Sequence, residues 1–139
     1  MWNKLSLEKA KTEYHVEYVI KSISSGGMFP TFEDFWNALE SADIVELTDD
    51  LDMNVGNRSH TSSKENLLSM IKGFASYPKY RNEKTLDNLY SRIKAGESMD
   101  MPIILRWPNG RMRIMAGNTR CDVAKHLGKN PMVYMVDVR

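Results

Sequence analysis

Five consecutive residues near the C-terminal end have the types and spacing of an anion-binding loop: Ala116, Gly117, Asn118, Thr119 and Arg120. They lie between a segment that predicts a strand and one that predicts a helix. A glycine at such a junction lets backbone N–H groups turn toward a ligand. The first turn of the following helix presents unpaired N–H groups and a partial positive charge, which together bind phosphate.

The side chains of this loop can add to its affinity for phosphate. Arg120 carries a planar guanidinium whose paired donors match phosphate oxygens. Thr119 can cap the helix or donate its hydroxyl to a phosphate, and Asn118 can offer an amide donor. The alternative is an ordinary strand-to-helix turn with a surface arginine, since short glycine motifs are common.

A second candidate group consists of carboxylates at the end of the first predicted strand: Glu46, Asp49, Asp50 and Asp52. Oxygen-rich clusters can hold Mg²⁺, which bridges to the phosphates of a nucleotide. One of the three aspartates could also act as a catalytic base for a hydroxyl acceptor. The alternative is an exposed acidic loop or a helix-capping set.

Composition limits the class of protein. With 139 residues, 42% of them hydrophobic and 27% charged, the chain fits one globular domain that needs no metal or disulfide to fold. Cys121 is the single cysteine, so no internal disulfide can form, and we expect a reducing, cytoplasmic environment. No apolar run approaches the length of about 20 residues that crosses a bilayer, so we expect no membrane partner.

The net charge of +1 hides an asymmetry along the chain. Residues 31–55 contain eight Asp or Glu and no Lys or Arg, whereas residues 101–139 contain seven Lys or Arg against two Asp. A locally basic C-terminal part suits an anionic ligand such as a nucleotide, or a nucleic acid. Chance clustering on a solvated surface explains the charge pattern equally well.

Periodicity predicts helices in the N-terminal two thirds of the chain. One begins at the Ser6 cap and runs as far as Ile23; another begins at Thr31. A third begins at Ser62 or Ser63 and stops before Pro78, and a fourth runs from Thr85 to Gly96. The polar stretch from residue 49 to residue 60, which contains Gly56, is expected to be a loop.

Strands are expected near 43–48, 102–107, 111–115 and 132–138, with a tight turn at 108–110 between the middle two and a helix over 119–127 closed by Gly128. The fold class is therefore α+β: a small mixed sheet surrounded by helices. We expect a helical extension over residues 1–42 that packs on a core domain over residues 43–139.

Five features occur in order in the C-terminal part. They are a helix ending in Ile93-x-x-Gly96, the strand Pro102-Ile103-Ile104-Leu105, a short hairpin, the loop Ala116-Gly117-x-x-Arg120 and the helix segment Ala124-x-x-Leu127-Gly128. This order over residues 85–138 resembles the N-terminal domain of the ParB family, also called the ParB/sulfiredoxin fold. Residues 1–42 have no counterpart in that resemblance.

The resemblance implies several activities, because ParB proteins bind and hydrolyse CTP, sulfiredoxins use ATP and another branch phosphorylates free serine. In these branches the Gly-x-x-Arg loop holds phosphates, a role that would fall here on Gly117, Asn118, Thr119 and Arg120. Relatives often carry an arginine after the first strand, which implies a phosphate contact for Arg58. ATP or CTP with Mg²⁺ is the implied cofactor, and small stand-alone domains of this kind are frequent in bacteriophages.

This sequence departs from the family at one informative position. The nucleophilic cysteine of sulfiredoxins and the glutamate of typical ParB loops would both fall at Asn118. Asparagine cannot act as that nucleophile, so sulfiredoxin activity is not expected, and nucleotide hydrolysis is in doubt while binding is not. Cys121 lies just after the loop and is expected to be structural.

Three functions remain open from the sequence. The first is a nucleotide-binding hydrolase, phosphotransferase or switch. The second is a DNA-binding or nuclease module, which the basic C-terminal part favours. The third is a non-enzymatic factor that binds a protein partner through the N-terminal helices, where Phe32, Phe35 and Trp36 give one helix an apolar face.

Overall fold

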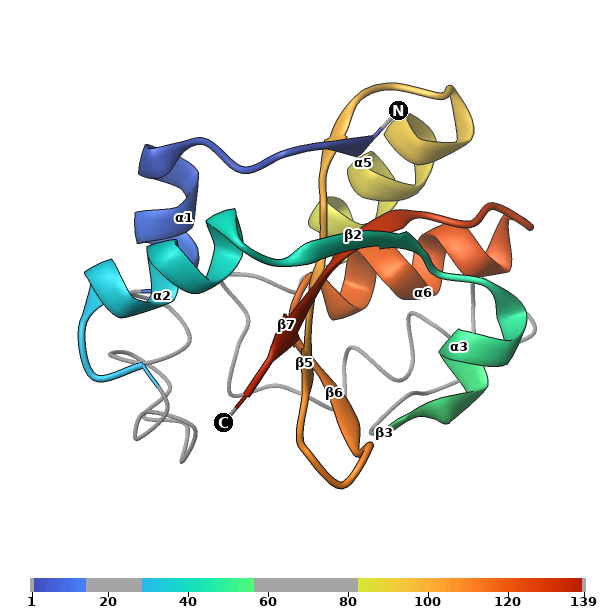
Figure 1. Cartoon of the computed structure of the whole chain (residues 1–139). Helices are drawn as coiled ribbons and strands as arrows, with labels where there is room; N and C mark the ends of the chain where they lie inside the picture. Colours follow the sequence, from blue (N-terminus) through green and yellow to red (C-terminus); the bar gives the residue numbers. More distant parts are fainter. Residues whose placement is uncertain (1, 15–28, 57–82, 139) are drawn as a thin grey trace.

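A computed structural model describes residues 2–14, 29–56 and 83–138 of the chain (Figure 1). The helices are α1 (Leu7–Tyr14), α2 (Phe32–Glu40), α3 (Asp49–Asn54), α5 (Glu83–Lys94) and α6 (Asn118–His126). The strands are β1 (Trp2–Asn3), β2 (Asp43–Glu46), β3 (Val55–Gly56), β4 (Met99–Asp100), β5 (Ile103–Arg106), β6 (Met112–Ala116) and β7 (Met132–Asp137). The predicted α+β class is confirmed.

The main sheet has five strands in the order β2-β7-β5-β6-β3. β2 pairs antiparallel with β7, β7 parallel with β5, β5 antiparallel with β6, and β6 parallel with β3. A separate two-stranded parallel sheet joins β1 to β4. The sheet is therefore mixed, as the sequence predicts, and its four longest strands are the four that apolar runs predicted.

Successive residues of the central strands point to opposite faces of the sheet. On β7, Tyr134 and Val136 belong to a core cluster that also contains Ala10, Phe35 and Leu39 from α1 and α2. Val133 and Met135, which alternate with them along β7, belong to a second cluster with Leu47 and Cys121. Helices α1 and α2 therefore cover one face of the sheet, and α6 covers the other.

Helix α5 packs against α6 (Figure 1). Ile93 of α5 and Val123 and Ala124 of α6 form a third buried cluster with Met99. Gly96 ends α5 with a φ of 79°, and Gly128 ends α6 with a φ of 71°, a left-handed conformation that suits glycine. Both glycine helix ends are confirmed predictions.

The hairpin between β5 and β6 is also confirmed. The N–H of Trp107 donates to the carbonyl of Arg111 over 2.8 Å, and the N–H of Gly110 donates to the carbonyl of Trp107 over 2.9 Å. Gly110 has a φ of 88°, which the tight turn requires. This hairpin delivers β6 directly to the loop that begins at Gly117.

Two predicted elements need correction. Residues 49–56 of the stretch expected to be a loop form helix α3 and strand β3, because the hydroxyl of Thr48 accepts from the N–H of Leu51 and three aspartates favour the first turn; residues 57–60 lie outside the described residues. Helix α5 begins at Glu83, before the expected cap at Thr85. The predicted helix beginning at Ser62 or Ser63 and the extension of the first helix to Ile23 lie outside the described residues.

Among the described residues, no helix combines the length and the apolar composition needed to cross a lipid bilayer.

Candidate anion-binding site at the start of helix α6

Gly117 is the N-cap of α6 and adopts the left-handed conformation, with φ 88° and ψ 23°. A side chain at this position would be strained by the backbone conformation alone. It would also collide with its surroundings, because a Cβ on Gly117 would lie 2.7 Å from Nη2 of Arg120 and 2.8 Å from Cβ of Pro102. Both the conformation and the lack of space therefore demand glycine here.

The side chain of Arg120 runs back along α6 toward the start of the helix, the direction that long helical side chains favour. Its Nε lies 3.0 Å and its Nη2 2.7 Å from the position of that Cβ, so the guanidinium packs over the Cα of Gly117. Its Nε is buried and, within the described residues, has no hydrogen-bond partner. An anion at the start of α6 would therefore lie beside a guanidinium with a donor to spare.

The first turn of α6 has no side-chain cap among the described residues and contains no Asp or Glu. Its backbone N–H groups therefore lack the oxygen acceptor that a Ser, Thr, Asp or Asn cap supplies. Thr119, expected as a possible cap, lies instead within the helix, because Gly117 occupies the cap position. The N–H of Cys121 bonds to the carbonyl of Gly117 over 2.9 Å and closes the first turn.

Among the described residues, Arg120 has an acidic neighbour that the sequence did not reveal. Nη2 of Arg120 lies 3.7 Å from Oε1 of Glu13 on α1, and the two side chains are 17% and 24% exposed. The distance makes this an ion pair without a direct hydrogen bond. A charge pair shielded this far from solvent is screened less than a pair on an open surface.

The predicted acidic group lies elsewhere. Asp49 forms an ion pair with Lys125 of α6, whose Nζ also donates to the carbonyl of Leu47 over 3.3 Å. Gly117 and Lys125 are eight positions apart in sequence, which corresponds to roughly 12 Å along a helix. The structure thus places Asp49 near the C-terminal end of α6 and the candidate phosphate loop at the opposite end.

The other two aspartates of α3 differ from each other. Asp50 is exposed, whereas Asp52 is 3% exposed and buried. In the part of the chain that the structure describes, no group of three or more His, Cys, Asp or Glu side chains is arranged to hold a metal ion. Arg58, the remaining residue predicted to contact phosphate, lies outside the described residues.

The basic residues of the C-terminal part are largely engaged within the protein. Arg106 forms two hydrogen bonds to Asp137, at 2.7 and 3.1 Å, and this carboxylate raises the pKa of the guanidinium. Lys129 donates to the carbonyl of Ile93 over 2.8 Å. With the ion pairs of Arg120 and Lys125, four of the seven basic residues have protein partners. The positive charge of residues 101–139 is therefore less available to a nucleic acid than the sequence suggested.

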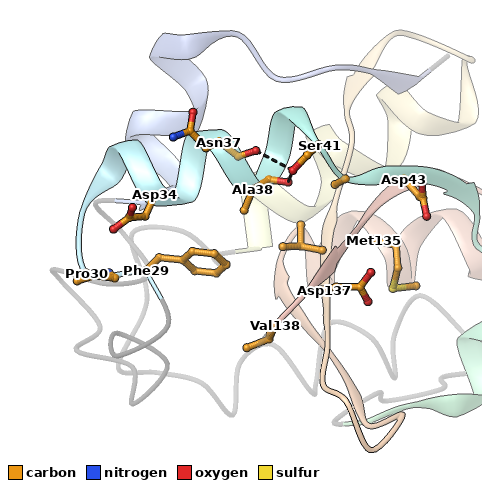
Figure 2. A pocket seen from close by; sticks show the side chains of 12 residues that line it. Phe29, Pro30, Asp34, Asn37, Ala38, Ser41, Asp43, Met135, Asp137 and Val138 are labelled. Atoms are coloured by element: carbon orange, nitrogen blue, oxygen red, sulfur yellow. Dashed lines mark hydrogen bonds between the residues drawn. The ribbon is translucent and has the colours of Figure 1, made fainter.

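A cavity of about 530 Å³ lies between α2 and the end of β7 (Figure 2), and its described lining contains no residue of the loop. Figure 2 shows Asp34, Asn37 and Ala38 of α2 on one side and Met135 and Asp137 of β7 on the other. Its lining among the described residues includes three aspartates and no Lys or Arg. An acidic lining repels phosphate, so this cavity does not suit the nucleotide that the loop suggests.

Cys121 and the aromatic residues of α2 have structural surroundings. Cys121 is fully buried in the cluster beneath α6, in agreement with the structural role expected for it. Phe35 is fully buried, and Phe32 and Trp36 pack against the same cluster. The apolar face of α2 is thus turned largely into the core.

Comparisons with protein-family models, with curated proteins and with solved structures find no match to this chain.

Proposed function

We propose that the loop Gly117-Asn118-Thr119-Arg120 binds the phosphate groups of a nucleotide, ATP or CTP, as part of a ParB-like domain. The observation that carries this proposal is the position of the Arg120 guanidinium over Gly117, with a buried Nε that has no hydrogen-bond partner in the described structure. A cationic fork and uncapped helix N–H groups therefore lie at the same end of α6.

The order of elements around the loop supports the ParB-like part of the proposal. A strand beginning after Pro102, a hairpin, the glycine loop and a helix closed by Gly128 follow one another as the resemblance implies. Mg²⁺ would arrive with the nucleotide, bound to its phosphates. A transfer or hydrolysis step is a further part of the proposal, and it requires a base that the described loop does not itself contain.

The DNA-binding or nuclease function is the second candidate, and the phosphate loop could serve it too. The pairing of Arg106, Arg120 and Lys125 with carboxylates disfavours it, because these charges are already partly neutralised. Such binding would weaken steeply as salt concentration rises. Nucleotide binding requires only one local anion site, whereas DNA binding requires an extended basic surface, so we prefer the nucleotide-binding function.

Calorimetric titration of ATP, CTP, GTP and ADP with Mg²⁺ into the wild type, Arg120→Ala and Arg111→Ala tests the proposal. We expect wild-type binding of at least one nucleotide and a loss of more than about tenfold in affinity with Arg120→Ala, because a charge-assisted contact contributes about 1.5–3 kcal/mol. Arg111 is a matched control, an exposed arginine whose guanidinium lies 5.5 Å from the ring centre of Trp107. Equal affinity of Arg120→Ala and wild type would remove the site assignment.

The preferred base separates the two family branches. Preference for CTP would favour a ParB-like switch, and preference for ATP a kinase-like relative. If no nucleotide binds, a titration with short duplex DNA at low salt decides whether the second candidate replaces the first.

A further inference from the structure

Helix α1 is fixed in place independently of Arg120. Ala10 is fully buried in the core, and the hydroxyl of Ser6 accepts from the N–H of Lys9 over 3.2 Å at the start of the helix. Nζ of Lys9 lies 2.9 Å from a carboxylate oxygen of Asp100. The hydroxyl of Tyr14 donates to the carbonyl of Phe29 over 2.8 Å. The carboxylate of Glu13 is therefore held near the start of α6 by the packing of α1.

Arg120 is likewise fixed without Glu13. Its guanidinium packs against Gly117, and the Cβ of Pro102 borders the same small space. The ion pair at 3.7 Å is too long for a hydrogen bond, so Glu13 supplies charge rather than geometry. Removing the carboxylate is therefore expected to leave the guanidinium where it is.

We infer that Glu13 acts as an internal competitor for the proposed phosphate site. The inference rests on the proposed function of the loop and assigns a regulatory role to α1, which precedes the ParB-like region. A phosphate at Arg120 would lie close to the Glu13 carboxylate in a partly buried place, where repulsion between like charges is weakly screened. Glu13 thus lowers anion affinity, and whatever moves α1 away raises it.

The competitor role and a structural role of Glu13 predict opposite changes in anion affinity when its carboxylate is removed. If Glu13 merely positioned Arg120, its removal would weaken binding; if it competes, its removal strengthens binding. The neutral isostere Glu13→Gln keeps the shape and removes the charge. Because Gln has nearly the same size as Glu and a helix propensity close to it, this substitution is not expected to unfold the helix.

The test is a titration of Mg²⁺-ATP, Mg²⁺-CTP and inorganic pyrophosphate into four proteins: wild type, Glu13→Gln, Glu8→Gln and the double variant Glu13→Gln with Arg120→Ala. Glu8 is the matched control, since it lies on the same helix and is exposed. We expect Glu13→Gln to raise affinity by about three- to tenfold, the range for loss of a partly shielded charge interaction. Glu8→Gln is expected to match the wild type.

The outcomes separate this inference from the proposed function. Tighter binding by Glu13→Gln that disappears in the double variant supports it, as does binding that appears only in Glu13→Gln. Wild-type binding that is unchanged or weakened in Glu13→Gln overturns the competitor role and leaves the phosphate loop intact. Absence of binding by both the wild type and Glu13→Gln overturns the proposed function and the competitor role with it.

Discussion

The guanidinium of Arg120 occupies the space that a side chain at Gly117 would need, since a Cβ there would lie 2.7 Å from Nη2. The two residues are separated by one turn of α6, and the absence of a side chain at the first allows the second to fold back over the helix start. The position of the Arg120 guanidinium therefore requires glycine at position 117. Substitution of Gly117 tests this relationship.

Gly117→Ala is expected to lower the free energy of unfolding by about 2–4 kcal/mol, combining left-handed strain with overpacking against Pro102 and Arg120. Gly110→Ala is the matched control, because Gly110 also has a φ of 88° but a Cβ there would meet nothing within 4 Å. It should cost only the strain, about 1–2 kcal/mol. Urea denaturation of both variants measures the difference; equal losses would show that the space over Gly117 is not restricted.

Most of the fold could be predicted because its signals are local. The four main strands are apolar runs bounded by turn residues, and the hairpin is marked by Pro108 and Gly110. Helix α3 could not be recognised by periodicity, since it has six residues and is established by the Thr48 cap and its acidic first turn. A threonine followed by aspartates is the available signal, and it is compatible with both alternatives for the acidic group, an exposed loop and a helix-capping set.

The candidate site was predictable only in part, because only some of its features have local sequence signals. A glycine between a strand and a helix indicates the loop, and the structure gives it the expected left-handed conformation. The partnership of Arg120 with Glu13 depends on how α1 packs, and no sequence pattern joins residues so far apart. The positions of Asp49 and Lys125 at the far end of α6 likewise follow from tertiary packing.

Asp49→Asn is expected to leave nucleotide affinity within about twofold of the wild type, because the helix separates Asp49 from the loop. The substitution should lower the free energy of unfolding by less than about 1 kcal/mol, since the Asp49 side chain is 90% exposed and Lys125, which is 14% exposed, keeps its hydrogen bonds to Leu47 and Asn130. Calorimetry and urea denaturation check the two quantities. Loss of nucleotide turnover with binding intact would instead support the catalytic role that the acidic group suggested.

Phe35→Ala is expected to lower the free energy of unfolding by about 3–5 kcal/mol, because the ring is fully buried between α2 and the sheet. Phe32→Ala, on the same helix but only partly buried, should cost about 1–2 kcal/mol. Thermal and urea unfolding measure both. If Phe35→Ala left stability unchanged, the aromatic face of α2 would be free for a protein partner, as the third function requires.

Tyr134 connects the sheet to the N-terminal segment and should make stability depend on alkaline pH. Its hydroxyl accepts from the N–H of Leu5 over 2.8 Å, and burial raises the pKa of the phenol above its ordinary value of 10.0. The folded protein then holds this proton more tightly than the unfolded chain. The contribution of the Tyr134 phenol to the free energy of unfolding is therefore fully present below about pH 10. It is lost as the pH rises through the pKa of the phenol in the folded protein.

Tyr134→Phe tests this relationship in two ways. Near pH 8 the variant should lose about 1–3 kcal/mol, because the buried N–H of Leu5 loses its acceptor. The difference from the wild type should shrink at about pH 11, where the wild type loses the contribution of its phenol. Urea denaturation at both pH values, with circular dichroism to confirm that each protein is still folded, measures the two differences. A difference that stays constant with pH would show that the titration of Tyr134 does not affect folding.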